Sequence, residues 1–233
     1  MNREHIAQTL KYLFEPKDVF EICMIGSKIR KSALWGNEYA GGKKPIVAGW
    51  FDDIEKATDI IVAADKLDPV AIYTTLNPAN KALLSRANNR LKASVNRTKD
   101  AEIIEVRNIL IDADPVRPAG ISSTELEKDS ALQLLRTIYS DLKELNWPEP
   151  LIADSGNGGH LIYPVEPGLA KSIPDLLKAL DRKYSTDTVI IDTTVGNPAR
   201  LVKVYGTVTR KGDSTGDRPY RTSKILSLPK EVS

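Results

Sequence analysis

Three aspartates at the ends of two apolar segments are the residues best suited to chemistry in this chain. Asp112 and Asp114 end the segment Asn-Ile-Leu-Ile-Asp-Ala-Asp, and Asp192 ends Thr-Val-Ile-Ile-Asp. Residues two apart on a strand point to the same face, so the first two carboxylates are expected side by side. Taken singly, each fits an ordinary strand end. Together they indicate a site for two divalent ions such as Mg²⁺ or Mn²⁺, which support phosphoryl transfer.

A second group of polar residues lies between these aspartates, in Asp-Ser-Gly-Asn-Gly-Gly-His. The Asn-Gly pair at 157–158, flanked by apolar runs, is typical of a two-residue hairpin turn in which both residues have positive φ. That turn pairs Gly156 with Gly159 and places Ser155 opposite His160, with Cβ atoms about 5 Å apart. A hydroxyl and an imidazole beside glycines would hold an anionic phosphate tail. A plain hairpin with an incidental histidine is the alternative.

Two basic segments flank the acidic residues. Residues 77–99 contain six basic and no acidic side chains, with Arg86 and Arg90 one turn apart on a predicted helix, and residues 197–224 contain seven basic and two acidic ones. Each segment is also compatible with a solvated surface or a flexible loop. Beside an acidic metal site, they are expected to contact phosphates of a template and of an incoming triphosphate.

Alternating strand and helix patterns predict a mixed α/β (α+β) fold in two lobes that form one integrated unit. Residues 1–100 would form an N-terminal α/β lobe with a basic helix, and residues 101–233 a second lobe. The second lobe has the order β-α-β-β-α-β of a ferredoxin-like or RNA-recognition-motif sheet. The predicted strands are 20–26, 69–75, 108–114 and 188–192, with a hairpin around 157–158, and the predicted helices are 50–67, 79–92, 123–145 and 174–184.

Composition limits the classes of function. The chain has 233 residues, 41% of them apolar and 27% charged, with a net charge of +2, so any affinity for nucleic acid must come from local patches. Its one cysteine, Cys23, cannot form an internal disulfide, which fits a reducing compartment. One cysteine and two histidines cannot build a structural zinc site. With no signal-peptide core and no apolar stretch of spanning length, we expect a cytoplasmic protein that does not enter membranes.

The ordered set of motifs resembles a known family. An Asp-x-Asp strand end, a Ser/Gly-rich turn ending in His, and a later apolar run ending in Asp look like the motifs of the archaeo-eukaryotic primase superfamily, in its primase-polymerase branch. Upstream, Ile-Tyr-Thr-Thr-Leu-Asn-Pro and the arginines that follow are similar to the N-terminal half of that family. Downstream, the segment from Asn-Pro-Ala-Arg to Arg-Pro-Tyr-Arg is similar to plasmid, phage and CRISPR-associated members. The resemblance runs from about residue 72 to 227.

This resemblance implies a catalytic core that makes and extends primers on a single-stranded DNA template with dNTPs or NTPs. It implies two Mg²⁺ or Mn²⁺ ions on the three aspartates, and a helicase or CRISPR adaptation proteins as possible partners. The residues it assigns to the nucleotide are Ser155, Gly156, Asn157, His160, Arg200 and Lys203, and those assigned to nucleic acid are Arg86, Arg90, Arg210, Lys211 and Arg221.

Two alternatives come from other classes. A non-catalytic replication initiator or single-stranded nucleic-acid-binding module has the same order of elements, but its aromatic base platform is missing, because phenylalanine occurs only at positions 14, 20 and 51. A metal-dependent nuclease would use the same three aspartates. A nuclease has no triphosphate to hold, so the Ser155 and His160 pocket favours a polymerase.

Overall fold

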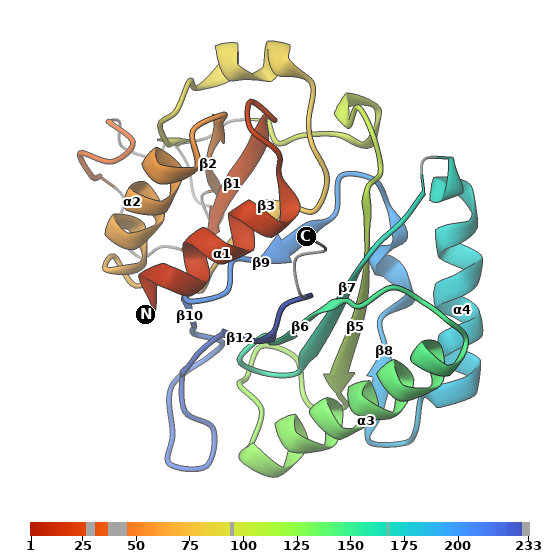
Figure 1. Ribbon diagram of the computed structural model, residues 1–233. Helices are drawn as coiled ribbons and strands as arrows, with labels where there is room; N and C mark the ends of the chain where they lie inside the picture. Colours follow the sequence, from red (N-terminus) through yellow and green to blue (C-terminus); the bar gives the residue numbers. More distant parts are fainter. Residues whose placement is uncertain (27–30, 37–45, 94–95, 167, 230–233) are drawn as a thin grey trace.

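The computed structural model describes residues 1–26, 31–36, 46–93, 96–166 and 168–229 (Figure 1). Within them the strands form two five-stranded antiparallel sheets and a small two-stranded sheet of β10 (Val208–Thr209) and β11 (Arg221–Thr222). The first sheet has the order β4-β2-β1-β3-β9, and the second has the order β12-β6-β7-β5-β8. The first consists of β4 (Lys92–Ala93), β2 (Ile46–Phe51), β1 (Phe20–Ile25), β3 (Ala71–Thr75) and β9 (Leu201–Lys203). The second consists of β12 (Lys224–Ser227), β6 (Leu151–Asp154), β7 (Gly159–Pro164), β5 (Asn108–Pro115) and β8 (Val189–Ile191).

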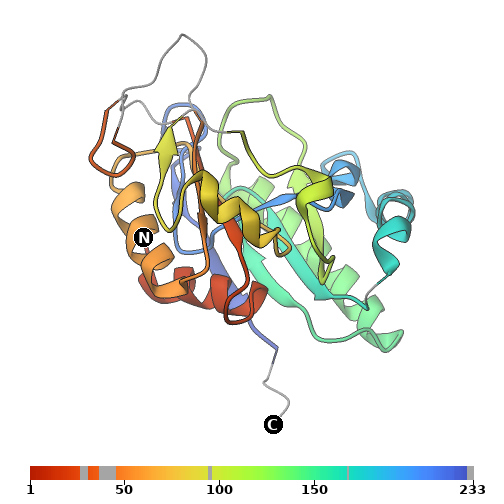
Figure 2. The same cartoon turned by 90° about the horizontal axis from the view of Figure 1, so that it is seen from above.

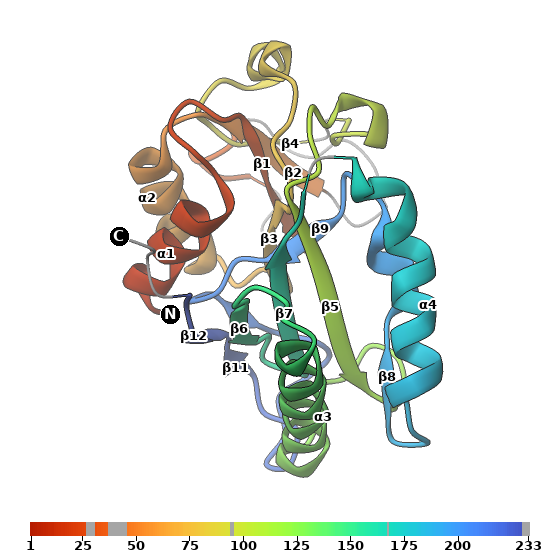
Figure 3. The ribbon, with the colours of Figure 1, turned by 45° about the vertical axis from the view of Figure 1, so that its right-hand side comes forward.

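The second sheet has the element order predicted from the sequence. Its central part runs β5, α3 (Glu125–Glu144), β6, β7, α4 (Ile173–Tyr184), β8, so the expected β-α-β-β-α-β order is confirmed. Thr124 begins α3 with a capping box, in which its side chain accepts from the Glu127 N–H and the Glu127 side chain accepts from the Thr124 N–H. Both helices pack on this sheet, and Figure 3 shows α3 alongside β5 and β7 and α4 beside β8.

The first sheet takes strands from both ends of the chain. Helices α1 (Arg3–Leu13) and α2 (Ile54–Asp65) lie side by side next to it, and β9 comes from the second half of the sequence to pair with β3. Seen from above, the two sheets with their helices form two halves that meet along the middle of the molecule (Figure 2). The predicted division into two lobes near residue 100 stays a prediction. Strand β9 follows residue 100 in the sequence and yet belongs to the first sheet.

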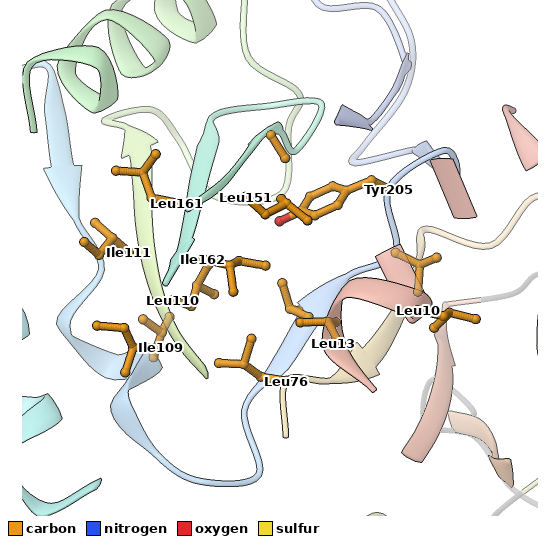
Figure 4. Close-up of a cluster of buried hydrophobic side chains, with 14 of the residues drawn as sticks. Leu10, Leu13, Leu76, Ile109, Leu110, Ile111, Leu151, Leu161, Ile162 and Tyr205 are labelled. Carbon is orange, nitrogen blue, oxygen red and sulfur yellow. The ribbon is translucent and has the colours of Figure 1, made fainter. Parts of the chain in front are cut away.

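One apolar cluster extends across both sheets. Figure 4 shows Leu10 and Leu13 of α1 near Leu76, close to Leu110 and Ile162 of the second sheet, and all five are buried. Burying such side chains supplies the main stabilising free energy of a domain. The two sheets are therefore held together by a shared core. No helix in the described parts of the chain is long and apolar enough to cross a membrane.

Two predicted helices of the N-terminal half differ from the structure. The expected helix 50–67 is shorter, because Trp50 belongs to β2, where it pairs with Glu21 and its indole N–H donates to Thr98 Oγ1 at 2.9 Å. Helix α2 begins only at Ile54, after Asp53, whose carboxylate caps it. Local periodicity had merged a buried strand with the helix that follows it.

The expected basic helix 79–92 is wrong. Residues Lys81–Arg86 form a 3₁₀ helix, Asn89 has a φ of +48°, and β4 begins at Lys92. Arg86 and Arg90 therefore do not share a helix face. Main-chain hydrogen bonds to Val19 and Trp50 replace a helical ladder here. Arg86 lies over the Trp50 ring, 5.3 Å from its centroid, and pairs with Glu102.

These contacts predict that Arg86 stabilises the fold. Replacing Arg86 with Ala should lower the free energy of unfolding by about 1–2 kcal/mol, because a charged hydrogen bond and a cation–π contact are lost. Arg90→Ala, a change at an exposed neighbour, should stay within about 0.5 kcal/mol. Urea denaturation of both variants measures the difference, and equal effects would contradict a structural role for Arg86.

Candidate functional site

A cavity of about 380 Å³ lies between the two sheets and is lined by residues of both. Tyr73 and Lys203 come from the first sheet, on β3 and β9. The second sheet and its loops contribute most of the residues predicted for the site. The predicted residues on the cavity wall are Asp112, Asp114, Asp192, Ser155, Asn157, His160, Arg200, Lys203 and Lys211.

The alternation of β5 explains why both of its aspartates face the cavity. Ala113 pairs with Gly159, whose Cα lies against Leu135 of α3, so this face of the sheet is covered by the helix. Asp112 and Asp114 therefore point to the opposite face. Asp112 pairs with His160 across the strands, and its Oδ1 lies 3.4 Å from His160 Nε2. The two carboxylates of Asp112 and Asp114 therefore lie on the same face of β5, as their spacing predicted.

The two carboxylates have opposite pKa shifts. Burial would raise the pKa of Asp112, but the neighbouring His160, with Lys211 and Arg200 farther away, holds it below the ordinary value. Burial raises the pKa of Asp114, the charge of Asp112 raises it further, and Arg117 opposes this only in part. Arg117 lies 3.4 Å from Asp114 Oδ1. The protein's own cations thus compensate one carboxylate and leave the other under-compensated.

Asp192 joins the acidic strand through its backbone. Its N–H donates to the Asp112 carbonyl at 2.9 Å, and its Oδ1 accepts from the Thr194 N–H at 2.8 Å. Among the described residues, no three His, Cys, Asp or Glu side chains converge closely enough to form a metal site. The donor chemistry still fits a hard divalent cation, because three carboxylates line one cavity and Asp114 lacks full compensation.

The hairpin that carries His160 has a different register from the predicted one. His160 pairs with Ala153, and Gly159 pairs with Asp154, so residues 155–158 form a four-residue loop and Ser155 is not opposite His160. The positive φ is at Gly156, +97°, and not at the Asn-Gly pair. Hydrogen bonds within the loop and from Thr209 to the Ser155 carbonyl fix this shape. Both side chains still line the cavity.

Asn157 carries a donor without a partner. Its Oδ1 accepts from the N–H of Ser123 at 2.8 Å and from the Ser123 hydroxyl at 3.2 Å, which fixes the orientation of the amide. Its buried Nδ2 has no hydrogen-bond partner. Only 3% of the Asn157 surface is exposed. A buried donor in this state costs free energy unless a ligand supplies an acceptor.

Two arginines of the cavity wall also have a buried donor without a hydrogen-bond partner. Arg97 Nε and Arg200 Nε are buried without a hydrogen-bond partner, and both residues line the cavity. Arg97 Nε still forms an ion pair with Glu21, 3.8 Å from its Oε1, and the Arg200 guanidinium donates to the Thr194 carbonyl. Within the described residues, all buried side-chain nitrogens that lack a partner thus belong to the wall of this cavity. The cavity is arranged for an acceptor-rich, anionic ligand.

Lys203 lies deep in the site. Only 2% of its surface is exposed, its Nζ donates to the Val208 carbonyl at 3.1 Å, and it lies 5.9 Å from the centroid of the Tyr73 ring. Burial lowers the pKa of Lys203 to about 7, although Asp65 opposes the shift. Lys211, which the sequence had assigned to nucleic acid, lines the cavity instead.

Four other arginines predicted to bind nucleic acid lie outside the cavity lining. Arg210 pairs with Asp65 at 3.0 Å and also with Asp68, and Arg221 pairs with Glu125 at 3.1 Å. These carboxylates lie far away in the sequence, so the composition of the basic segment did not reveal them. The other two are Arg86, paired as described above, and the exposed Arg90.

Sequence reasoning missed several residues of the cavity wall. Tyr73 and Thr209 had no local signal, because each lies in an ordinary strand. Arg97 was only one of several basic residues in its segment, and the buried Glu21 beside it gave no signal either. Burial raises the pKa of Tyr73 to about 12, and the nearby Asp112 adds to the shift. Its hydroxyl therefore stays protonated.

Comparisons with known proteins add no assignment. The sequence matches no protein-family model, and it gives no significant match to a curated protein. The geometry of the cavity is therefore the basis for the functional interpretation.

The close approach of the loop to β5 predicts that position 158 needs glycine. A Cβ at Gly158 would lie 2.3 Å from the Ala113 carbonyl oxygen and 3.0 Å from Asp114 Oδ1. Gly158→Ala should therefore lower the free energy of unfolding by about 1–3 kcal/mol. Gly216→Ala is the matched control, because nothing lies within 4 Å of its added Cβ. Chemical denaturation compares the two, and equal stability would contradict the close approach.

The opposite pKa shifts predict opposite effects of neutralising the two carboxylates. A raised pKa in the folded state means that ionised Asp114 destabilises the fold, so Asp114→Asn should raise the melting temperature at neutral pH in chelator. Asp112→Asn should lower it, because the favourable contact with His160 is lost. The Asp114 difference should vanish as the pH falls to about 4, whereas the Asp112 difference should be lost only at still lower pH, because the pKa of Asp112 in the folded state lies below its unfolded value. Melting curves against pH test this, and shifts of the same sign would contradict the assignment.

Proposed function

We propose that this protein is a template-dependent DNA primase and DNA polymerase, a primase-polymerase that transfers nucleotides from triphosphates to a 3′-hydroxyl and also starts primers. The observation that carries the proposal is one cavity with two complementary halves. Three carboxylates, suited to cations, line the same space as three buried nitrogen donors without hydrogen-bond partners, which are suited to anions. A metal-bound nucleoside triphosphate has both kinds of charge.

The order of the motifs along the fold also supports this proposal. The Asp-x-Asp pair, the His-containing hairpin and the third aspartate come from β5, β7 and the end of β8, which are neighbours in one sheet. In the proposal, this sheet is the catalytic sheet of the RNA-recognition-motif type, and the first sheet is the N-terminal lobe of a primase-polymerase core.

In the proposed reaction, Asp112, Asp114 and Asp192 would hold two Mg²⁺ or Mn²⁺ ions. When bound, these ions supply activation of the 3′-hydroxyl and neutralisation of the leaving pyrophosphate. A third carboxylate beside the Asp-x-Asp pair would add oxygen ligands for these ions. The raised pKa of Asp114 is consistent with a carboxylate whose charge is balanced only when the site is filled.

The chain's own donors would bind and orient the triphosphate. The ring of His160 and the amide of Asn157 lie on the hairpin side of the cavity, where they would donate to phosphate oxygens. Arg200 and Lys203 would offset the charge that develops on the leaving group. Preorganised donors act strongly in such a site because they need no rearrangement as charge develops.

The template would contact basic residues that form no ion pair within the described parts of the chain. Lys211 lines the cavity and Arg90 is exposed, whereas carboxylates pair with Arg86, Arg210 and Arg221. We therefore propose that Lys211 and Arg90 are more important for single-stranded DNA than the three paired arginines.

The proposal is tested by synthesis on primed and unprimed single-stranded DNA with labelled nucleotides and Mn²⁺. Asp114→Asn should lower synthesis at least about a thousandfold, because charge stabilisation by the ions is worth several kcal/mol. Single-strand binding should stay intact or improve, since negative charge is removed. Asp175→Asn, whose side chain is 85% exposed on α4, should keep the activity of the unaltered protein.

The outcomes separate the candidate functions. No product on either template would overturn the proposal. Shortening of the labelled strand without extension would assign the three aspartates to a nuclease. DNA binding without any reaction, unchanged in all aspartate variants, would assign a binding module.

A further inference from the structure

Tyr205 links the first sheet to the histidine of the candidate site. It follows β9, is fully buried, and its hydroxyl oxygen lies 2.8 Å from His160 Nδ1 on β7 of the second sheet. The two rings meet edge to face, with centroids 5.8 Å apart. Figure 4 shows the Tyr205 ring extending from the chain after β9 toward Leu151, with its hydroxyl at the far end.

The partners of the imidazole determine which nitrogen carries the proton. His160 Nε2 faces Asp112 at 3.4 Å, and an ionised carboxylate only accepts hydrogen bonds. A neutral imidazole has one N–H group, and a proton on Nε2 suits the facing carboxylate and leaves Nδ1 as an acceptor. The Tyr205 hydroxyl is then the donor to Nδ1. Burial raises the pKa of Tyr205 well above its ordinary value, and the charge of Asp112 adds to this, so the hydroxyl keeps its proton.

We propose that Tyr205 is a positioning residue that holds His160 in the tautomer with the proton on Nε2. The imidazole then always presents an N–H group to the cavity, where an anionic oxygen of a bound phosphate would accept it. The use of this donor for a nucleotide rests on the proposed function, whereas the tautomer itself does not.

A purely structural role for Tyr205 makes a different prediction. The ring packs in the shared core, and a phenylalanine in its place would keep that packing. Tyr205→Phe therefore removes the hydroxyl and little else. If the hydroxyl only met its own hydrogen-bonding requirement in the core, its removal would not change the tautomer of His160.

The tautomer is measurable because the chain has only two histidines. Nitrogen-15 spectra of the metal-free, nucleotide-free protein labelled at histidine, in mildly alkaline buffer, report both rings. His5 is an internal control, since its Nδ1 accepts from the Ile225 N–H at 3.1 Å, a partner that Tyr205→Phe leaves in place. We expect both rings to carry the proton on Nε2 in the unaltered protein. In Tyr205→Phe, the tautomer ratio of His160 should shift about fivefold toward Nδ1–H, the effect of one lost hydrogen bond, while His5 is unchanged.

The outcomes are distinct. A proton on Nδ1 of His160 in the unaltered protein, in either the neutral or the charged ring, would overturn the proposal. An unchanged ratio in the folded variant would also overturn it. If the variant does not fold, a scalar coupling between the Tyr205 hydroxyl proton and the His160 Nδ1 nucleus in the unaltered protein supports the proposal, and its absence opposes it. A triphosphate titration comes second: no binding by the unaltered protein would count against the proposed function and leave the tautomer result standing.

Discussion

The repulsion between two adjacent carboxylates shapes the polar half of this protein. Asp112 and Asp114 cannot turn away from each other, because the opposite face of β5 packs against α3 and fixes the direction of every second side chain. Charges held together away from bulk water must be balanced by partners. His160 lies beside the first aspartate and Arg117 beside the second, and the balance at the second is incomplete. A bound cation would complete it.

The basic residues divide into two groups according to whether their buried hydrogen-bond donors have partners. Arg86 and Arg210 are held by ion pairs with acids that lie elsewhere in the sequence, and they contribute to the fold. Arg97 and Arg200 line the cavity, and each has a buried Nε atom without a hydrogen-bond partner, although Arg97 Nε lies 3.8 Å from Glu21 Oε1. This second group is preorganised for an anion, at a cost in stability that a ligand would remove. The net charge of +2 conceals this division.

The site depends on contact between the two sheets. The chain returns from the second sheet to the first at β9, which brings Lys203 into the cavity and Tyr205 to His160. Tyr12 of α1 makes a further link, because its hydroxyl donates to the Ile162 carbonyl of β7 at 3.0 Å. Any shift of one sheet against the other would move Lys203 in the cavity and break the contact between Tyr205 and His160. The shared apolar core therefore also maintains the geometry of the site.

The sequence by itself determined the features that depend on neighbouring residues. The two-residue period of β5 placed both aspartates on one face, and the predicted helix 123–145 matches α3 closely. Only the tertiary structure decided the shape of the loop at 155–158, where the positive φ is at Gly156 and Thr209 donates to the Ser155 carbonyl. It also decided which basic side chains form ion pairs, as Arg210 does with Asp65. The physical reason is that backbone periodicity and capping act over a few residues, whereas ion pairs and buried hydrogen bonds join residues that only folding brings together.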